Sequence, residues 1–215
     1  MSESEAFPEA HLVPEQRSAV YRLLARLWGR EIDGGLLSQL REPVMSEAMA
    51  GVGLTLDAEL AQLSADRALE ELAAEYTRLF LGPGPHITPC QSMYAPASGE
   101  QPGLIGTPSA ATRRFLSQLG LSYDDSYTGL PDAIDVHLDV MGRLAGEEAR
   151  RRREGDTKGA AKARSIQHQF LTEHLLRFVA PLCRDVRAAT SLDLYRSLAE
   201  ATERFVSLDY GDLMC

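Results

Sequence analysis

The sequence predicts an all-α protein: a single-domain helical bundle with a central joint rich in glycine and proline. Apolar residues recur at helical spacing along most of the chain, most clearly between Ala19 and Trp28. The alternation of apolar and polar residues that is typical of strands is almost absent. Glycine and proline gather at 82–85, 99–108 and 129–131, so they separate helices and do not indicate low complexity.

The same periodicity places the helices along the chain. It predicts helices over residues 15–30, 68–80, 107–120, 132–151, 166–182 and 194–206. Pro14 suits the first turn of the first helix, and Ser64 is placed to cap the second. Gly120 ends the third helix. Residues 34–62 are expected to hold one or two shorter helices, because glycines interrupt the apolar pattern there.

Length and composition predict one domain over residues 1–215. The chain has 215 residues, of which 44% are hydrophobic and 25% charged, enough to bury one sizeable core. The joint divides this domain into two sub-lobes, at about 12–98 and 107–210, with a hinge at about 99–106. Such a joint allows either a monomer or a domain-swapped dimer.

Charge and targeting signals restrict the partners and the compartment. The net charge of −9 argues against nucleic acid, whose phosphates attract basic surfaces. The first residues, MSESEAFPEAHLVPEQ, are acidic and lack the pattern of a secretory signal. No apolar run approaches the ~20 residues of a membrane-spanning helix, so membrane insertion is not expected. Three widely spaced cysteines fit reduced thiols, and we expect a cytoplasmic protein.

Four consecutive arginines begin the stretch 150–164, RRRREGDTKGAAKAR. A twin-arginine targeting signal would lie at the N-terminus, before an apolar segment, so this position excludes one. The stretch has no apolar face, and it is interpreted as a solvated helix end followed by a mobile connection.

Motifs for catalysis and cofactor binding fail when tested against their required spacing. GPGPH and GLIGTP lack the lysine and the spacing of a phosphate-binding loop. His86 and Cys90 are four residues apart, but prolines preclude a regular helix there and no further pair completes a metal site. The sequence therefore predicts no metal and indicates no enzyme.

One polar cluster remains, formed by Asp132, Asp135, His137 and Asp139. On a helix, Asp135 and Asp139 share one face while His137 points to the opposite side, so a single ion is not easily held by all three. Asp139 lies four residues before Arg143, the spacing of a surface ion pair. His137 shares the side of apolar residues, which favours burial.

Five segments, in fixed order, resemble a known family. They are EYTRLFLGPG, TPCQSMY, GLPDAIDVHLDVMGRLA, QFLTEHLLRF and LYRSLAEATERFVSLD. Together they resemble the hallmark segments of the TorD/DmsD/NarJ-type redox-enzyme maturation chaperones, from about residue 70 to about residue 208.

This resemblance implies an all-helical cytoplasmic chaperone without catalytic turnover or cofactor. Such a chaperone serves a molybdenum-cofactor oxidoreductase. It binds the catalytic subunit of that client, or the client's N-terminal twin-arginine signal peptide, until the cofactor has been inserted. The identity of the oxidoreductase is not specified by the sequence.

The resemblance also points to peptide-binding positions. Carried over residue by residue, these are Leu79, Phe80, Gln91, Ser92, Tyr94, Gly106, Pro131 and Asp132, to which Asp135 and His137 of the polar cluster are added. The chain departs from the family pattern at Ala133, where histidine is frequent, and at His137, where an acidic residue is frequent. Cys90 and Gln91 stand where Tyr and Glu are common. These losses of a carboxylate and an imidazole suggest a client whose recognition depends less on charge. Phe178 replaces a tryptophan, which is a change in packing.

The chemistry of this role agrees with the residue types. A twin-arginine peptide presents two guanidinium groups and then an apolar segment, so its receptor needs carboxylates beside an apolar groove. Leu79, Phe80 and Tyr94 can equally be core residues, and Asp132 can be a helix N-cap.

Two other functions stay open at this point. One is a small helical enzyme that uses a nucleotide or a metal through the cluster from Asp132 to Asp139, with guanine nucleotide as the ligand suggested by the family. The other is a structural subunit that remains with a complex.

Overall fold

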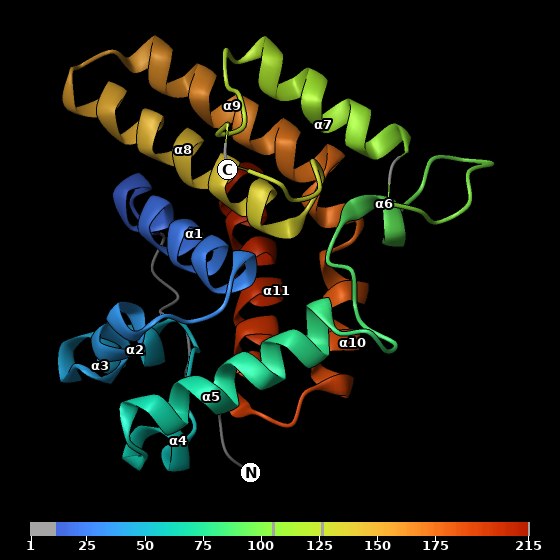
Figure 1. Cartoon of the computed structure of the whole chain (residues 1–215). Coiled ribbons are helices and arrows are strands. Elements are labelled where there is room, and N and C mark those ends of the chain that lie inside the picture. Colours follow the sequence, from blue (N-terminus) through green and yellow to red (C-terminus); the bar gives the residue numbers. More distant parts are fainter. Residues whose placement is uncertain (1–11, 105, 126, 215) are drawn as a thin grey trace.

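The computed structural model describes residues 12–104, 106–125 and 127–214 of the chain. Within these residues the named elements are all helices, which confirms the all-α prediction (Figure 1). The elements are α1 (Pro14–Gly29), α2 (Gly34–Arg41), α3 (Pro43–Gly51), α4 (Ala58–Gln62), α5 (Ala65–Tyr76), the π-helix η1 (Thr77–Leu81), α6 (Gln91–Tyr94), α7 (Thr107–Gln118), α8 (Ile134–Arg153), α9 (Thr157–Glu173), the 3-10 helix η2 (Leu175–Arg177), α10 (Val179–Ala189) and α11 (Asp193–Met214).

The close packing of α1 against α8 organises the molecule (Figure 1). The two helices run antiparallel, since Gly29 at the end of α1 lies beside Asp135 at the start of α8. Gly142 permits the approach, because a Cβ atom there would lie 3.0 Å from Cγ of Arg22. Ser18 then donates a 2.7 Å hydrogen bond to the carbonyl of Gly142. A helix from the N-terminal part of the chain is thus embedded in the C-terminal part.

A buried charged network joins four helices behind this contact. Arg17 of α1 forms ion pairs with Glu148 of α8 at 3.2 Å and with Asp209 of α11 at 2.5 Å. Gln167 of α9 donates to Glu148 at 2.9 Å, and Tyr21 donates to Asp209 at 2.7 Å. Burial raises the pKa of Asp209, and Arg17 opposes that shift. Removing one partner would leave an unpaired buried charge, so the network fixes the relative positions of α1, α8, α9 and α11.

The α5–η1 segment is attached to the C-terminal part of the chain through Glu75. Its carboxylate accepts hydrogen bonds from Arg78, Thr190 and the backbone N–H of Ser191, at 2.7–2.8 Å. Burial alone would raise the pKa of Glu75, but these hydrogen bonds outweigh it and lower the pKa to about 2. One continuous hydrophobic core therefore contains side chains from both predicted sub-lobes, and the hinge at 99–106 stays a prediction.

Several predicted boundaries are confirmed. Pro14 is the first residue of α1, Ser64 accepts a hydrogen bond from the N–H of Arg67 at 3.4 Å, and Gly120 follows α7 with φ of +69°. The region 34–62 holds three short helices, one more than the upper expectation. Gly53, at φ +75°, turns the chain after α3.

The single helix predicted over 166–182 is wrong, because α9 ends at Glu173 and α10 begins at Val179. Pro181 explains the interruption: inside one long helix it would clash with the carbonyl four residues before it, whereas near the start of α10 it is tolerated. The break also lets His174 leave the helical path, with φ −123° and ψ −78°, and turn into the core.

The mobile connection predicted within 150–164 is also wrong. Helix α8 continues to Arg153 and α9 begins at Thr157, so only a tight turn separates them. Ion pairs bind the arginines of this stretch: Arg150 and Arg151 to Glu147, Arg152 to the buried Glu148, and Arg153 to Glu15. These arginines are thus paired along α8 and with α1, and Arg151 also pairs with Asp156 in the turn before α9 at 2.7 Å, so they do not form a free patch. Among the residues that the structure covers, no helix has the length and apolarity to cross a membrane.

Candidate functional site

The central joint, which runs from the glycine–proline cluster at 82–85 to the one at 99–108, is bound to the start of α8 by backbone hydrogen bonds. The N–H of Gln91 donates to the carbonyl of Asp132 at 3.0 Å, and the N–H of Ile134 donates to the carbonyl of Pro89 at 2.8 Å. These bonds form an isolated antiparallel bridge between Cys90 and Ala133. Prolines and glycines allow the extended backbone that this pairing needs. The joint is thereby held against the second half of the chain.

Asp132 secures the joint with its side chain. Its carboxylate is 0% exposed and accepts hydrogen bonds from the N–H of Ser92 at 2.7 Å and from the hydroxyl of Ser109 at 2.6 Å. Interpreting it as the N-cap of its own helix is wrong, because Ala133 occupies that position. The carboxylate serves the short helix α6 and the first turn of α7 instead.

Two histidines continue this polar cluster inward. Nδ1 of His174 lies 3.0 Å from Oε1 of Gln91, and Nε2 of His137 lies 3.1 Å from the hydroxyl of Thr112. Burial lowers the pKa of His137 well below its usual value and that of His174 to about 4, so both imidazoles are neutral at pH 7. The rings of Phe170 and Phe178 pack edge-on against His137. The predicted burial of His137 is confirmed.

The remaining predicted positions are mostly enclosed. Leu79, Phe80 and Pro131 are buried, and Phe80 packs against Trp28 with ring centroids 5.7 Å apart. Tyr94 is half-buried and donates to Asp185 at 3.1 Å. Gly106 precedes α7, where a Cβ atom would lie 3.1 Å from Oε2 of Glu100. Direct contact between these residues and a peptide stays a prediction, and for the buried ones it requires the joint to move.

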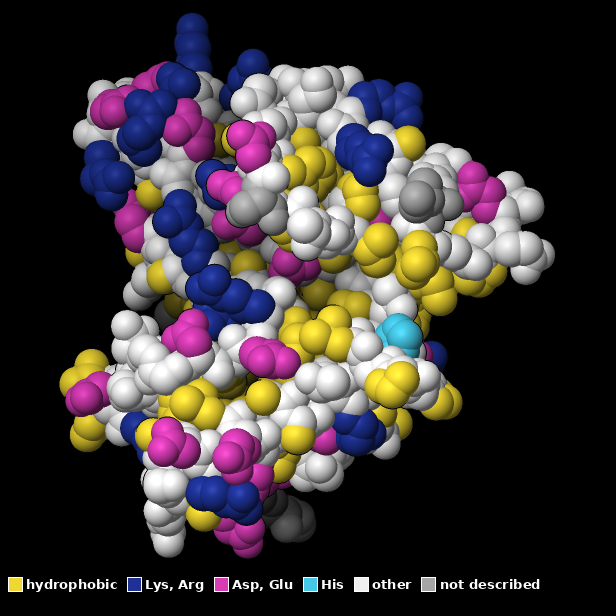
Figure 2. Space-filling view, in the orientation of Figure 1, with side chains coloured by type: hydrophobic (Ala, Val, Ile, Leu, Met, Phe, Trp, Pro, Cys, Tyr) yellow, Lys and Arg dark blue, Asp and Glu magenta, His cyan; other side chains and the backbone are white. Residues whose placement is uncertain are grey.

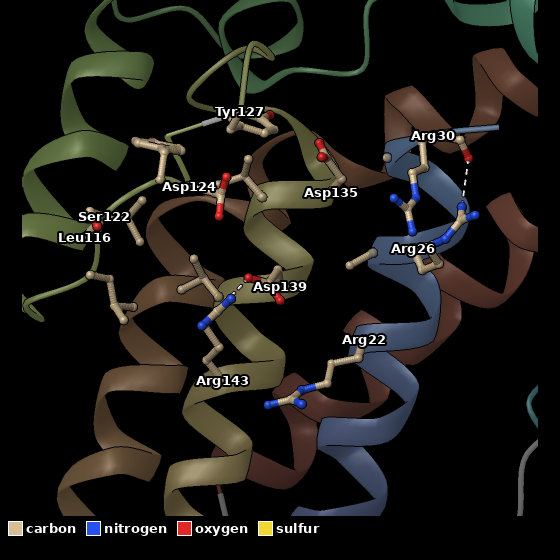
Figure 3. Close-up of a pocket in the computed structure, with 16 residues that line it drawn as sticks. Arg22, Arg26, Arg30, Leu116, Ser122, Asp124, Tyr127, Asp135, Asp139 and Arg143 are labelled. Atoms are coloured by element: carbon tan, nitrogen blue, oxygen red, sulfur yellow. Dashed lines mark hydrogen bonds and ion pairs between the residues drawn. The ribbon is translucent and has the colours of Figure 1, made fainter. Parts of the chain in front are cut away.

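A pocket of about 430 Å³ opens beside this cluster, between α1, α8 and the segment 121–127 (Figure 3). Tyr123 and Tyr127 stack at 5.6 Å on one side of it. Its lining residues are Arg22, Ala25, Arg26, Gly29, Arg30, Leu116, Leu121, Ser122, Tyr123, Asp124, Tyr127, Asp135, Val136, Asp139, Val140 and Arg143. Apolar and charged side chains thus meet in one cavity, and this face also carries a hollow with apolar and acidic side chains along it (Figure 2).

Asp135 is the unusual residue of this pocket. It lies at the start of α8, where it is half-buried, and it has no ion pair within the described part of the chain. Burial raises the pKa of its carboxyl to about 6, although backbone N–H groups of its own helix oppose the shift. By contrast, Asp139 on the same face pairs with Arg143 at 2.6 Å, as predicted. A carboxylate that is desolvated but unpaired is a good acceptor for an incoming cation.

Arginines form the opposite wall of the pocket, and sequence reasoning missed them. Arg22 and Arg26 are four residues apart on one face of α1, and Arg30 directly follows the helix in an extended conformation. Arg26 binds Asp33 at 2.6 Å and the carbonyls of Arg30 and Glu31. Across the covered ranges, neither Arg22 nor Arg30 forms an ion pair. The regular spacing was the available signal, but it gave no reason to place these side chains opposite α8.

A second pocket, of about 420 Å³, lies between the joint, α7 and α9. Gln91 and His174 form part of its floor beside Phe115, and Arg114 and Arg177 lie at its edge. Its one acidic residue, Glu173, accepts a hydrogen bond from Gln169 at 3.0 Å. This pocket therefore offers less to a cationic ligand than the pocket that contains Asp135.

The alternative of an enzyme acting through Asp132, Asp135 and Asp139 finds no support in this geometry. Asp132 is enclosed by Ser92 and Ser109, whereas Asp135 and Asp139 line the pocket. No group of three or more His, Cys, Asp or Glu residues in the described ranges is arranged to hold a metal ion.

Comparison with known proteins identifies relatives along most of the chain. Residues 43–184 match the family model described as nitrate reductase delta subunit. The TorD chaperone of Shewanella sp. (strain ANA-3) is 34% identical over 92% of this chain and 93% of its own length. The TorD chaperone of Shewanella pealeana is 29% identical over 94% of this chain and 91% of its own length.

A solved structure shares the fold. The structure is that of a protein described as a redox enzyme maturation protein from Archaeoglobus fulgidus, and the similarity has a TM-score of 0.53 at 19% sequence identity. It covers 93% of this chain and 96% of that one. The arrangement of helices in Figure 1 is therefore that of a known all-helical fold.

Proposed function

Because this chain belongs to the family of TorD-type redox-enzyme maturation chaperones, we propose that it acts in the cytoplasm on a molybdenum-cofactor oxidoreductase. It binds the N-terminal basic leader segment of that client, with a guanidinium group on Asp135, until the cofactor has been inserted. Like its relatives it is a chaperone and not a catalyst.

The observation that supports this assignment is the unpaired carboxylate of Asp135 beside an apolar wall. An arginine within about 4–6 Å lowers the pKa of a carboxyl group by about 1–3 units. Each unit corresponds to about 1.4 kcal/mol of binding free energy at neutral pH. Leu116, Leu121 and Val136 line the same pocket and can receive the apolar part of the leader. A few such contacts suffice for micromolar binding, at about −8 kcal/mol.

The test uses a peptide with the leader sequence of a molybdoenzyme encoded beside this gene, in calorimetric titrations. We expect Asp135→Asn to weaken binding by at least tenfold, and replacement of the two peptide arginines by lysines to weaken it as well, because lysine cannot form the bidentate contact. Asp139→Asn is the matched control: it removes one charge from the same pocket, but that charge is already paired with Arg143.

Binding should also depend on pH in a defined direction. The carboxyl of free Asp135 has a pKa of about 6, and a bound guanidinium lowers it, so the complex releases a proton near pH 6. Affinity should fall between pH 7 and pH 5, and Asp135→Asn should remove most of that dependence. Equal affinities of the wild-type protein and Asp135→Asn at pH 7 would disprove the assignment.

A further inference from the structure

The pocket that contains Asp135 carries an excess of unpaired positive charge, which the proposed function alone does not explain. Two of its arginines, Arg22 and Arg30, lack an ion pair in the parts of the chain that are described, although the protein has 31 acidic and 22 basic residues. Arg22 projects from α1 toward α8, and Arg30, which directly follows α1, lines the same pocket (Figure 3). In the surface view, basic side chains lie over α1 with acidic ones beside them (Figure 2).

None of the four arginines that line the pocket forms an ion pair with Asp135 among the described residues. Arg26 binds Asp33, and Arg143 binds Asp139. Asp135 itself lies against Gly29, where its Oδ2 would be 3.0 Å from an added Cβ atom, whereas the guanidinium group of Arg22 lies toward Gly146. The pocket therefore keeps an unpaired carboxylate on one wall and unpaired guanidinium groups on the other.

We propose that this pocket selects a bipolar segment, in which an arginine contacts Asp135 and an acidic side chain of the same segment contacts Arg22. This inference rests on the proposed function, and it specifies the partner more narrowly. A purely basic segment would be repelled by Arg22 and Arg30, whereas a neighbouring carboxylate turns that repulsion into attraction. The arrangement therefore gives specificity among basic leaders.

The packing of α1 on α8 sets the distance between the two charges. Asp135 lies beside Gly29, and the stem of Arg22 lies beside Gly142, with Nη2 of Arg22 3.9 Å from where a Cβ atom of Gly146 would lie. Gly146 is eleven residues after Asp135 on α8, so the two charges are separated by about 16 Å along the helix at 1.5 Å per residue. An extended peptide spans that distance in about five residues. The acidic residue should thus lie about five positions from the arginine that binds Asp135.

A double-mutant cycle tests the contact between Arg22 and the peptide. One leader peptide carries glutamate about five positions before its arginine pair, and another carries it about five positions after the pair. Each has a matching peptide with glutamine at the same position. Arg22→Gln should weaken binding of one of the glutamate peptides by at least fivefold and that of the matching glutamine peptide by less than twofold. Arg143→Gln is the matched control, because Asp139 already pairs with that guanidinium. Arg22→Glu should recover binding when the peptide glutamate becomes lysine.

The outcomes separate the inference from the proposed function. If Arg22→Gln affects both peptides of each pair equally, or neither, the bipolar contact is disproved. Asp135→Asn still reports independently on the arginine contact. If no peptide binds the wild-type protein, both proposals fail. Urea unfolding of each variant identifies changes in binding that arise from loss of the fold; Arg22→Gln keeps the aliphatic stem against Gly142 and should preserve it.

Discussion

Asp132 and Asp135 are three positions apart at the start of α8, but their carboxylates lie in opposite environments. Asp132 is fully buried and accepts two hydrogen bonds, from Ser92 and Ser109. Asp135 lines a pocket without an ion pair, and burial raises its pKa to about 6. The carboxylate of Asp132 holds the joint in place. The carboxylate of Asp135 stays free to bind a ligand, and its burial lowers the free energy of unfolding at neutral pH.

The same contrast extends to the surroundings of each residue. Gln91, Thr112 and His174 continue the buried cluster of Asp132 with further hydrogen bonds. Around Asp135, Arg22 and Arg30 are unpaired within the described residues. Polar side chains that stabilise the fold have hydrogen-bond partners inside the protein, whereas those proposed to bind a ligand have no ion-pair partner there. Removing the carboxylate of Asp132 should therefore lower the free energy of unfolding, whereas removing the charge of Asp135 should raise it.

The largest effect is expected from Asp132→Ala. It leaves the N–H of Ser92 and the hydroxyl of Ser109 buried without an acceptor, so the free energy of unfolding should fall by about 3 kcal/mol in urea titrations. Ser109→Ala removes only one donor and should cost about 1 kcal/mol. If Asp132→Ala left stability intact and abolished peptide binding, Asp132 would be a ligand contact and the contrast with Asp135 would fail.

The next effect concerns the buried histidines and has a defined pH window. Burial lowers the pKa of His137 and that of His174, to about 4, below the ordinary value of 6.5. Their neutral forms thus contribute stability above pH 6.5, which is lost as the pH falls. Between pH 6.5 and pH 5 the free energy of unfolding should drop by about 2 kcal/mol for each histidine, at ~1.4 kcal/mol per pH unit.

Asp135 has the opposite effect between pH 6.5 and pH 5. Because its pKa is raised in the folded state, its protonation increases the free energy of unfolding as the pH falls. The titration is therefore best measured in the Asp135→Asn background, with and without His174→Gln, which keeps a polar partner for Gln91. A pH-independent free energy of unfolding over this range would show that the imidazoles are not buried in the neutral form.

The two regions also differ in how far the sequence could predict them. The apolar periodicity was sufficient for α1, α5 and α8, and the shared face of Asp135 and Asp139 followed from helical spacing alone. The buried role of Asp132 depends on Ser92 and Ser109, which are brought to it by the folded joint. Likewise, Arg22 and Asp135 belong to one pocket only because α1 packs on α8, a contact that local patterns do not encode.

A stabilising effect is expected from Asp135→Asn. The pKa of the carboxyl is raised in the folded state, so the stability that comes from protonation is present below about pH 4 and lost as the pH rises through 6. At pH 7 the ionised group therefore destabilises the fold, and asparagine should increase the free energy of unfolding by about 1–2 kcal/mol. The gain should disappear at pH 4. Loss of stability at pH 7 would show that Asp135 is a structural residue.

The smallest effect is expected from Asp139→Asn, on the same face of α8. Its ion pair with Arg143 is exposed, and exposed pairs four residues apart on a helix contribute about 0.3–0.5 kcal/mol. The free energy of unfolding should change by no more than that, and binding of a purely basic peptide should weaken less than twofold. The freed Arg143 adds positive charge to the pocket, so a peptide with an acidic residue should bind slightly more tightly, most clearly at low salt. A loss of affinity as large as that of Asp135→Asn would mean that both carboxylates bind the ligand, and that being unpaired does not distinguish the binding residue.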